Sequence, residues 1–445
     1  MNVKILNVEL LYFCKFEPDI LGKGCLEFLK IAFLGGTHAI GKSAIAVKAG
    51  EVTAILDYGV AVNGVPSFPM HISPKTVDFV IVTHAHLDHS GAVPLFHVSR
   101  PMPLYATAPT IDLMKLLIKD FIRLSGYYLP YEYLDINTMF EYSRALKYGE
   151  KFSIKNLQFT LLNAGHILGS AQVLIKAEGK RILYTGDIND VDTCLLEKIS
   201  KCQDPLDAVI IESTYADEDH PERAELEKEF VENVTNVVEG GGSVLIPAFS
   251  VGRSQEILTV LYKWNFPYPV AVDGMAVDAT QTFLKYVDWL RDPELFKKAV
   301  EKANWVSGWR DRRLLLKKRC VIIAPAGMLK GGTAVFYAEK LAKSSNNAIY
   351  LVSYQIPGTP GSELLEKGRF VIGGKVRKVK AEVKRFDFSS HIGMSGLKKF
   401  LSELEGSPVI YAVHGEAEKC QTLCKYARDL GFEAQAPKIG DVYEV

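Results

Sequence analysis

The segment Thr83-His84-Ala85-His86-Leu87-Asp88-His89 is the most informative part of this sequence, and it closes the compact apolar segment 78–83. The chain has ten histidines in 445 residues, and three of them stand in this segment. Imidazole and carboxylate groups are the usual protein ligands of Zn²⁺. Polar, half-ionised side chains at the end of a buried strand are costly unless they coordinate something. The segment therefore predicts a metal site at a strand end, where His84 and His86 face one ion and Asp88 and His89 can face a second.

Two ions need more ligands than these four, and three isolated polar residues further along the chain are candidates. They are His166, Asp187 and His414, each of which follows a predicted strand and lies next to a glycine. A single histidine in such a place is more often a structural residue than a ligand. Taken with residues 84–89, however, the three residues complete two metal sites.

Hydrophobic periodicity divides the chain into regions. Up to residue 212 the sequence is rich in short strands, which are predicted at Leu29–Leu34, Ala44–Lys48, Thr53–Asp57, Phe152–Leu162, Val173–Ala177, Arg181–Tyr184 and Asp207–Glu212, with a helix at Ala108–Ser125. From residue 213 strands and helices alternate, which is typical of a parallel sheet covered on both faces. The helices are Pro221–Glu239 and Ser254–Trp264, and the strands are Val270–Val272, Val321–Ala324 and Ala348–Val352.

These patterns predict an α/β protein with an insertion. The first domain covers residues 1–212, with an N-terminal extension at 1–28, and the second α/β domain covers 213–384. Residues 385–445 are expected to complete the first domain, with a strand at Val409–Val413 and a helix at Glu416–Leu430.

Composition limits the class of protein. Lys+Arg and Asp+Glu are equal at 52 each, which argues against a histone-like nucleic-acid binder but leaves room for a local basic groove. No run of about 18 apolar residues is present in the sequence, so we expect no membrane-spanning helix. The seven cysteines are odd in number, widely spaced and without a CxxC pair, which favours a reducing cytoplasmic location.

The order of these polar residues resembles a known superfamily. Asp57, the HxHxDH motif at 84–89, His166 and Asp187 resemble the metallo-β-lactamase superfamily, whose fold is an αββα sandwich with metals at the strand ends. Three later residues resemble the additional motifs of its β-CASP branch; they are Glu212, His391 and His414. Two further segments, Ile246–Glu256 and Ala326–Gly332, also match that branch, and the resemblance covers about residues 29–445.

The resemblance implies a metallo-β-lactamase αββα sandwich with an inserted α/β β-CASP domain that closes over the active site. β-CASP proteins are nucleases of RNA or DNA, and the RNA members include the cleavage and polyadenylation specificity factor endonuclease, its archaeal relatives and RNase J. The length of this chain resembles that of the short archaeal relatives that lack RNA-binding KH domains. Dimers are common in the family, so a homodimer is an open expectation.

By this resemblance the chain binds two Zn²⁺ ions. His84, His86 and His166 would hold one ion, Asp88, His89 and His414 the other, and Asp187 would bridge them. Two cations about 3.5–4 Å apart can hold a hydroxide between them and neutralise the charge that develops on phosphorus.

The resemblance also implies roles for residues around the metals. His391 would protonate the leaving oxygen, Glu212 would orient His391, and Asp57 would support the ligands from behind. Phosphate contacts are expected from Arg253, Ser250, Gly331 and Gly332. One departure is that Ile392-Gly393 follows His391, where many relatives have an Ala-Asp pair.

The leading prediction is a zinc-dependent nuclease that cuts single-stranded RNA, as an endonuclease, a 5′–3′ exonuclease or both. The alternatives are a DNA nuclease, a hydrolase of a non-nucleic-acid ester such as a thioesterase or lactonase, and an inactive scaffold. The non-nucleic-acid alternative leaves Glu212, His391 and the insertion unexplained, and the intact ligand set argues against a scaffold.

Two other features have competing interpretations. Gly36–Ser43 matches the GxxxxGK[ST] phosphate-loop pattern, but the β-rich residues after it argue against the helix that such a loop needs. The basic stretches Trp309–Arg319 and Lys375–Arg385 are either solvated surface or a wall that guides a nucleic-acid backbone. Their aromatic neighbours Trp305, Trp309 and Phe386 could stack on bases, although core packing is the commoner role.

Overall fold

The computed structural model describes residues 29–62, 64–125 and 128–445. The predicted N-terminal extension at 1–28 lies outside the described residues. No helix among the residues described has the length and apolar character needed to cross a bilayer.

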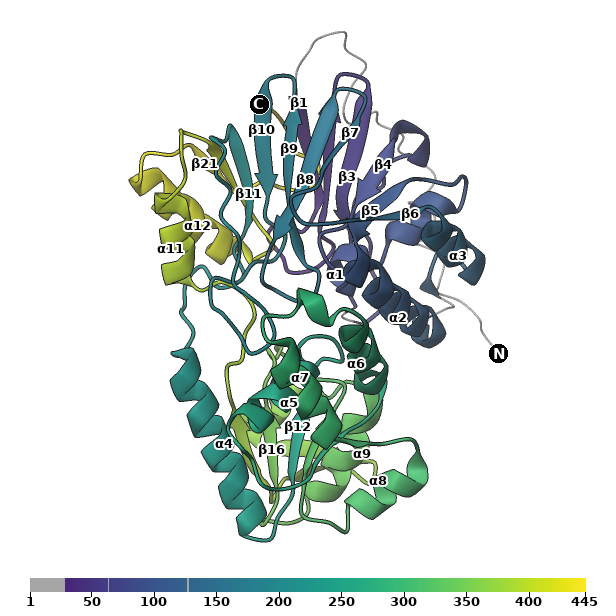
Figure 1. Ribbon diagram of the computed structural model, residues 1–445, viewed down its shortest axis with the longest axis vertical. Helices are drawn as coiled ribbons and strands as arrows, with labels where there is room; N and C mark the ends of the chain where they lie inside the picture. The colour runs from purple at the N-terminus through teal and green to yellow at the C-terminus, as the bar shows by residue number, and fades with distance from the viewer. Residues whose placement is uncertain (1–28, 63, 126–127) are drawn as a thin grey trace, which may run out of the picture.

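Two seven-stranded sheets pack face to face and form the upper lobe in Figure 1. In order, the first sheet consists of β22 (Val442–Glu444), β1 (Leu29–Gly35), β2 (Ala44–Ala49), β3 (Val52–Tyr58), β4 (Phe79–Ile81), β5 (Leu104–Thr107) and β6 (Ser143–Leu146). The second consists of β21 (Ala434–Gln435), β20 (Val409–Val413), β11 (Ala208–Glu212), β10 (Lys180–Tyr184), β9 (Ala171–Ala177), β8 (Leu157–Asn163) and β7 (Lys151–Ile154). Their inward-facing side chains, such as Phe33, Phe79 and Phe159, form one continuous apolar core.

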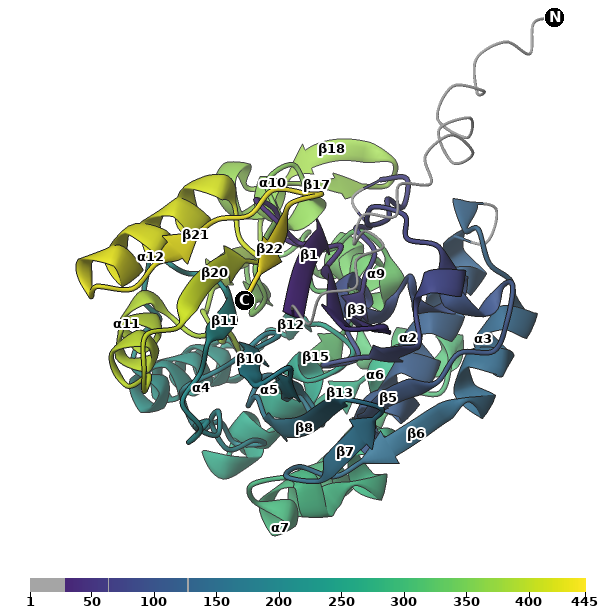
Figure 2. The same ribbon diagram turned by 90° about the horizontal axis from the view of Figure 1, so that it is seen from above.

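Helices cover both outer faces of this pair of sheets. Helices α2 (Ala108–Ser125) and α3 (Tyr133–Glu141) lie on the first sheet, and α11 (Met394–Ser402) and α12 (Ala417–Asp429) lie on the second. The arrangement is the αββα sandwich that the sequence predicts. Strand β22 lies beside β1, as the view from above shows (Figure 2), so the end of the chain completes the sheet that residue 29 begins.

One predicted strand is wrong. The expected strand Phe152–Leu162 is a hairpin of β7 and β8, with a turn at Lys155-Asn156. Lys155 adopts φ +51°, a left-handed conformation that reverses the chain. The apolar residues on both sides of this short turn give the appearance of a single strand in the sequence.

A six-stranded sheet, parallel throughout, forms the lower lobe in Figure 1. Its order is β14 (Asn304–Trp305), β13 (Val270–Val272), β15 (Val321–Ala324), β12 (Val244–Pro247), β16 (Ala348–Leu351) and β19 (Glu382–Arg385). The helices of this lobe are α4 (Arg223–Glu239), α5 (Arg253–Lys263), α6 (Met275–Lys285), α7 (Pro293–Lys302), α8 (Trp309–Leu315), α9 (Gly332–Leu341) and α10 (Pro360–Lys367). Both faces are buried, with Ile246 packed among α4 and α5 and Leu245 packed against α9, because a fully parallel sheet needs cover on each side.

Shorter elements complete the fold. A hairpin of β17 (Arg369–Ile372) and β18 (Lys375–Lys378) stands apart from the three large sheets. A single α-helical turn, α1 (Leu87–Ser90), follows β4, and 3-10 turns occur at Pro74–Thr76, Val93–His97 and Val287–Trp289.

The chain crosses between the lobes twice, and the two crossings lie side by side. The first follows β11 and the second follows β19, and a bridge pairs Tyr215 with Gly393. The Met394 amide donates to the Glu218 carbonyl at 3.0 Å, and His220 Nδ1 lies 3.0 Å from Asp387 Oδ2. The lower lobe is thus an insertion between β11 and the closing elements of the upper lobe, and we retain 213–384 as its proposed extent.

Candidate metal centre and active site

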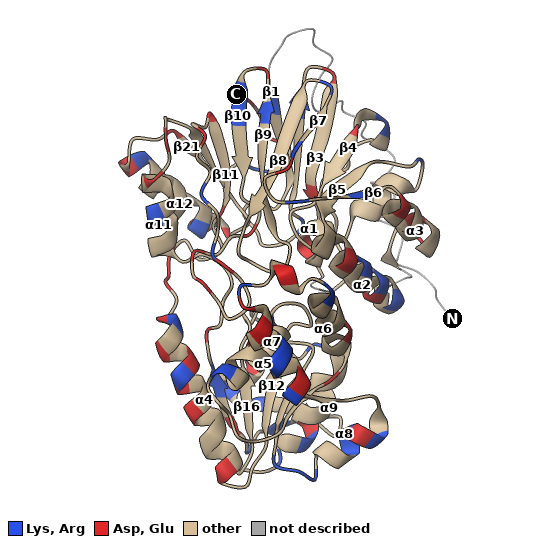
Figure 3. Ribbon diagram, in the orientation of Figure 1, with Lys and Arg blue, Asp and Glu red and all other residues tan. Residues whose placement is uncertain are grey.

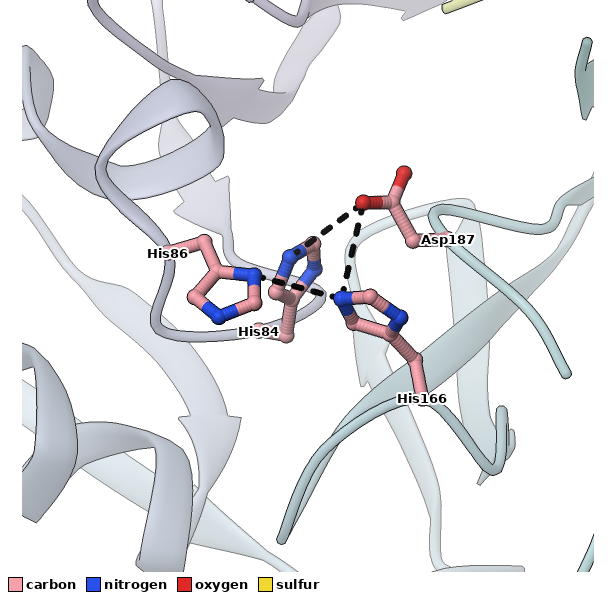
Figure 4. Close-up of side chains that lie close together, drawn as sticks. All are labelled: His84, His86, His166 and Asp187. Carbon is pink, nitrogen blue, oxygen red and sulfur yellow. Dashed lines mark hydrogen bonds and ion pairs between the residues drawn. The ribbon is translucent and has the colours of Figure 1, made fainter. Parts of the chain in front are cut away.

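Four side chains from three segments of the chain converge where strands of the upper lobe end (Figure 4). His84 and His86 follow β4, His166 follows β8 and Asp187 follows β10, and their ligand atoms all lie within 4.8 Å of one another. Asp187 Oδ2 lies 3.5 Å from His84 Nε2 and 3.7 Å from His166 Nε2. His86 Nδ1 is 3.2 Å from His166 Nε2.

The other oxygen of Asp187 faces a second group. Asp187 Oδ1 lies 3.2 Å from His89 Nε2 and 3.2 Å from His414 Nδ1. His414 Nε2 is 3.3 Å from Asp88 Oδ2, so Asp88 belongs to the same group. The structure therefore brings together all seven predicted ligands, which we call the candidate metal centre, with Asp187 between its two halves.

The chemistry of these donors fits divalent cations. His84 Nε2 and Asp187 Oδ1 are buried and make no hydrogen bond within the described part of the chain. An unsatisfied buried carboxylate among imidazoles is costly unless a positive charge joins it. Imidazole nitrogen and carboxylate oxygen donors suit first-row divalent metals, of which Zn²⁺ is one. The orphaned atoms and the donor set indicate a metal-binding site.

Three of these groups favour the protonation state that a metal needs. His89 is the exception, because its burial is outweighed by the charges of Asp187 and Asp57, which raise its pKa well above the usual range. Burial, followed by the charges of neighbouring imidazoles, holds the pKa of His84 and of His166 well below the usual range. Burial opposes ionisation of Asp187, but the charges of His414 and His89 outweigh it and hold the pKa of that carboxyl well below its usual range. Neutral imidazole and ionised carboxylate are the forms that coordinate a metal.

Asp57 lies behind His89 and orients it. His89 Nδ1 donates to Asp57 Oδ2 at 2.7 Å, and Tyr184 donates its hydroxyl to the same oxygen at 2.9 Å. The Thr83 amide donates to Asp57 Oδ1 at 2.7 Å. Both oxygens of this fully buried carboxylate therefore accept hydrogen bonds. Asp57 therefore contacts the metal centre through His89, in the position that carboxylates behind metal-bound histidines commonly take.

Two supporting residues were missed from the sequence. Ser390 accepts a hydrogen bond from His166 Nδ1 through its backbone carbonyl at 2.8 Å, and Tyr184 buttresses Asp57. Only its position next to His391 could have drawn attention to Ser390. A tyrosine at the end of an apolar strand carries no local signal at all.

Backbone geometry at three positions shows how closely packed the site is. Asp57 and His414 adopt φ +56° and +50°, left-handed conformations that are unusual outside glycine. Gly59 lies so close to α1 that an added Cβ would be 1.7 Å from the Asp88 carbonyl oxygen. Only glycine allows the end of β3 to approach the turn that carries Asp88 and His89.

His391 and Glu212 form a pair beside the metal centre. His391 Nδ1 donates to Glu212 Oε2 at 2.8 Å, and Glu212 Oε1 accepts from the Ile188 amide at 2.7 Å. His391 Nε2 points toward Asp187, 4.0 Å from Oδ2. Burial alone would lower the pKa of His391, but the charges of Glu212 and Asp187 outweigh it and raise the pKa to about 9. These charges favour the protonated form of His391, whose Nε2 is placed to donate a proton.

Arg253 reaches the same place from the lower lobe. It begins α5, and its Nη2 lies 3.4 Å from Ser390 Oγ. A pocket beside His166 is lined by Arg253, Arg223 and Ser390. Arg253 Nε is buried with no hydrogen-bond partner in the described residues, and burial lowers the pKa of this guanidinium to about 10. A cation with an unused donor beside the metals is suited to a phosphate oxygen.

The other predicted phosphate contacts lie along one edge of the lower sheet. Ser250 follows β12 and is buried, with its carbonyl accepting from Gln255 Nε2 at 3.1 Å. Gly331 and Gly332 follow β15 and begin α9. A Cβ on Gly332 would lie 2.4 Å from the Pro325 carbonyl oxygen, so backbone packing requires glycine there. Ligands of parallel α/β sheets bind at this carboxyl edge.

The phosphate-loop pattern and the basic stretches can now be placed. Lys42-Ser43 leads into strand β2, so the helix start that a phosphate loop needs is absent from this described segment. Arg312 is a correction to the basic-wall hypothesis, because it binds the buried Asp273 with two bonds of 2.8 and 2.9 Å. A charge reversal at Arg312 would test folding rather than nucleic-acid binding. Lys375–Arg385 forms the exposed strand β18 and the edge strand β19, as expected for lysine-guarded edges.

Comparisons with known proteins cover most of the chain. A metallo-beta-lactamase superfamily domain matches residues 46–214, a Beta-Casp domain matches 254–364, and a Zn-dependent metallo-hydrolase RNA specificity domain matches 376–437. A crystal structure of a protein of unknown function from Enterococcus faecalis V583 has the same fold, with a TM-score of 0.59 and 15% identity over 94% of this chain and 100% of that one.

Archaeal relatives align over nearly the whole sequence. "RNase aCSPSF2" of Saccharolobus solfataricus is 41% identical over 93% of this chain and 84% of its own length. "Probable RNase MJ4" of Methanocaldococcus jannaschii is 34% identical over 93% of this chain and 99% of its own length. "Transcription termination factor FttA" of the same organism is 36% identical over 94% of this chain and 71% of its own length. With this similarity and this fold, the chain belongs to the β-CASP branch of the metallo-β-lactamase superfamily.

Proposed function

We propose that this chain is a zinc-dependent ribonuclease that hydrolyses phosphodiester bonds of single-stranded RNA. The observation that carries the proposal is the position of His391, whose Nδ1 contacts Glu212 and whose Nε2 faces Asp187, the carboxylate between the two halves of the metal centre. Hydrolysis of a phosphodiester needs a nucleophile, neutralisation of charge on phosphorus and a proton for the leaving oxygen. The site contains a group for each need.

The ligand assignment follows the two halves of the metal centre. His84, His86 and His166 would hold one Zn²⁺, and Asp88, His89 and His414 the other, with one oxygen of Asp187 directed at each half. When bound, the ions lower the pKa of a water molecule and neutralise charge on the phosphate.

The remaining steps belong to side chains of this protein. His391 donates its Nε2 proton to the oxygen that leaves phosphorus, and Glu212 keeps that imidazole oriented and charged. Arg253 binds a phosphate oxygen through its unpaired Nε, next to His166. Asp57 keeps His89 in the tautomer whose Nε2 faces the metals.

The names of the relatives support RNA as the substrate. Two of them are named RNases, and one matching domain is described as an RNA specificity domain. The mode of cutting, endonucleolytic or 5′–3′ exonucleolytic, is part of the test below. A cytoplasmic location accords with Cys194, Cys202, Cys320, Cys420 and Cys424, which are all free thiols.

The test uses 5′- and 3′-labelled single-stranded RNA and DNA of one sequence, with wild type, Asp88→Ala and His391→Ala. We expect the wild type to cut RNA in Zn²⁺ or Mn²⁺ and both variants to be strongly impaired. Fragments of many lengths would indicate an endonuclease, and released mononucleotides an exonuclease. Intact RNA with the metal-loaded wild type would contradict the proposal, and preferential cutting of DNA would favour a DNA nuclease.

A further inference from the structure

Trp309 is a large aromatic side chain that the structure leaves exposed on the lower lobe. It begins α8, and 56% of its surface is accessible, whereas Phe386 is buried in the core and only 3% exposed. Of the aromatic residues that the basic stretches suggest for base stacking, Trp305 is half-buried and Trp309 alone presents most of its ring. A single exposed apolar side chain is common on protein surfaces, so exposure by itself decides nothing.

What distinguishes Trp309 is that its ring is held in place. The Arg312 guanidinium lies 4.9 Å from the ring centroid, and that guanidinium is bound by two hydrogen bonds to the fully buried Asp273. Tyr337 donates to the same carboxylate at 2.8 Å. The rings of Phe336 and Trp309 pack edge to face, with their centroids 5.2 Å apart and their planes at 87°. A rigid ring loses little conformational entropy when a ligand stacks on it.

The surroundings of Trp309 are positively charged. Two exposed cations of α8, Arg310 and Arg313, lie near Trp309 in the chain, whereas the exposed Lys317, Lys318 and Arg319 precede β15 and so lie toward the opposite edge of the sheet. Figure 3 shows Lys and Arg on this part of the lower lobe. The one acidic residue of α8, Asp311, accepts bonds from the amide and hydroxyl of Ser307. A polyanion is therefore the partner that this surface favours.

The position of Trp309 connects it to the active site. Residues 306–309 follow β14, and the carboxyl ends of β14, β13, β15 and β12 lie along one edge of the sheet. The turn after β12 carries Phe249, which is 37% exposed, and leads to Arg253 beside His166. Three strand spacings separate β12 from β14, which is about 14 Å. The Gly327 turn lies between them, with a Cβ there placed 3.3 Å from the Phe249 amide.

We propose that Trp309 is a stacking platform for a base of single-stranded RNA that extends beyond the metal centre along this carboxyl edge. The proposal rests on the proposed ribonuclease function and adds a binding site outside the reacting phosphate. Aromatic stacking accepts any base, and the cations of α8 bind the sugar–phosphate chain without sequence preference. The platform thus favours long, unstructured RNA over short fragments.

The test compares two RNAs, one too short to reach beyond the metal centre and one of about 25 nucleotides that spans the edge. Trp309→Ala should weaken binding of the long RNA about tenfold, which is typical of the loss of one stacked base, and leave cleavage of the short RNA within about twofold of wild type. Trp309→Phe should keep most of the affinity. Leu314→Ala is the matched control, because Leu314 is an apolar residue of α8 that is 46% exposed.

Tryptophan fluorescence tests whether the long RNA contacts Trp309 directly. The long RNA should quench tryptophan fluorescence in the wild type more than in Trp309→Phe, which keeps the other three tryptophans. Equal affinity of wild type and Trp309→Ala for the long RNA would overturn the platform while leaving the ribonuclease proposal intact. Loss of self-association in Trp309→Ala, with unchanged RNA affinity per chain, would also overturn it and assign the ring to a contact between copies. A wild type that cuts neither RNA would instead contradict the proposed function.

Discussion

Among the residues that the structure describes, two buried clusters contain groups that can bind metals, yet only one is suited to a metal. The candidate metal centre gathers imidazoles around Asp187. The second cluster gathers Cys194, Glu227 and Glu256, whose ligand atoms lie within 4.8 Å of one another. In the second cluster the negative charges are already neutralised. Arg223 binds both glutamates, and Lys263 binds Glu227 at 2.6 Å.

The same contrast appears in the hydrogen bonds. Glu256 accepts from the Cys194 amide at 2.9 Å and the Leu195 amide at 3.1 Å, so it holds a loop of the upper lobe against α5. Asp187 has ion-pair distances only to histidines among the described residues, and one of its oxygens accepts no hydrogen bond. Proximity of ligand atoms therefore does not define a metal site. What matters is whether arginine or lysine side chains already compensate the carboxylates, as they do in the second cluster.

The largest expected effect comes from Asp187→Asn. It removes the charge that both halves of the metal centre share, so RNA cleavage should fall on the order of 10³-fold or more, because metal catalysis supplies several kcal/mol. Metal content, measured by atomic emission after dialysis, should fall in parallel, while circular dichroism stays native. Glu256→Gln serves as the contrast and should keep its metal. A full metal complement and normal rate in Asp187→Asn would remove the distinction between the clusters.

The next effect is on proton transfer. His391→Asn should lower kcat by roughly 10²–10⁴-fold with unchanged metal content, because it removes a general acid and no ligand. The acid must be protonated, and its pKa is raised to about 9, so the wild-type rate should hold at neutral pH and decline as the pH rises through about 9. Glu212→Gln removes the charge that raises this pKa, so the decline should move to lower pH. An unchanged pH–rate profile in Glu212→Gln would argue that another group is the acid.

Substitutions in the second cluster, where Arg223 and Lys263 pair with Glu227 and Glu256, should change the free energy of unfolding. Arg223→Met leaves Glu256 buried without its cation, which should cost about 3–5 kcal/mol in the free energy of unfolding measured in urea. Lys228→Met on the same helix breaks an exposed pair with Glu232 and should cost about 1 kcal/mol or less. Metal content should be unchanged in both. If Arg223→Met instead lost metal, the two clusters would be coupled.

The smallest effect is expected at Asp57. Asp57→Asn keeps the size of the side chain but weakens its hydrogen bond to His89 Nδ1. Substitution of a residue that hydrogen-bonds to a metal ligand usually reduces metal affinity or activity by about 10–100-fold. A zinc titration with a competing chelator gives the affinity directly. Thr53→Ala, on the same strand but outside the site, is the control and should bind zinc as the wild type does.

Prediction from sequence succeeded where the signal is local. Strands β13, β15 and β20 have the bounds that apolar runs predict, and helix α2 spans the predicted Ala108–Ser125. Prediction failed at β7 and β8, because a two-residue turn at Lys155-Asn156 has little compositional signal. It also misjudged Arg312, since the partner Asp273 lies 39 residues away in the chain and charge alone does not reveal pairing.

The sequence by itself determined which chemical groups form the site, because ligand types and spacings such as those of His84–His89 are properties of a short segment. Only the tertiary structure decided how those groups are used. It directs the two oxygens of Asp187 to different histidines, places Ser390 against His166 across 224 residues, and supplies Arg223 to the second cluster while surrounding Asp187 with histidines. These outcomes depend on which strand ends meet in space, and packing of whole sheets sets that geometry.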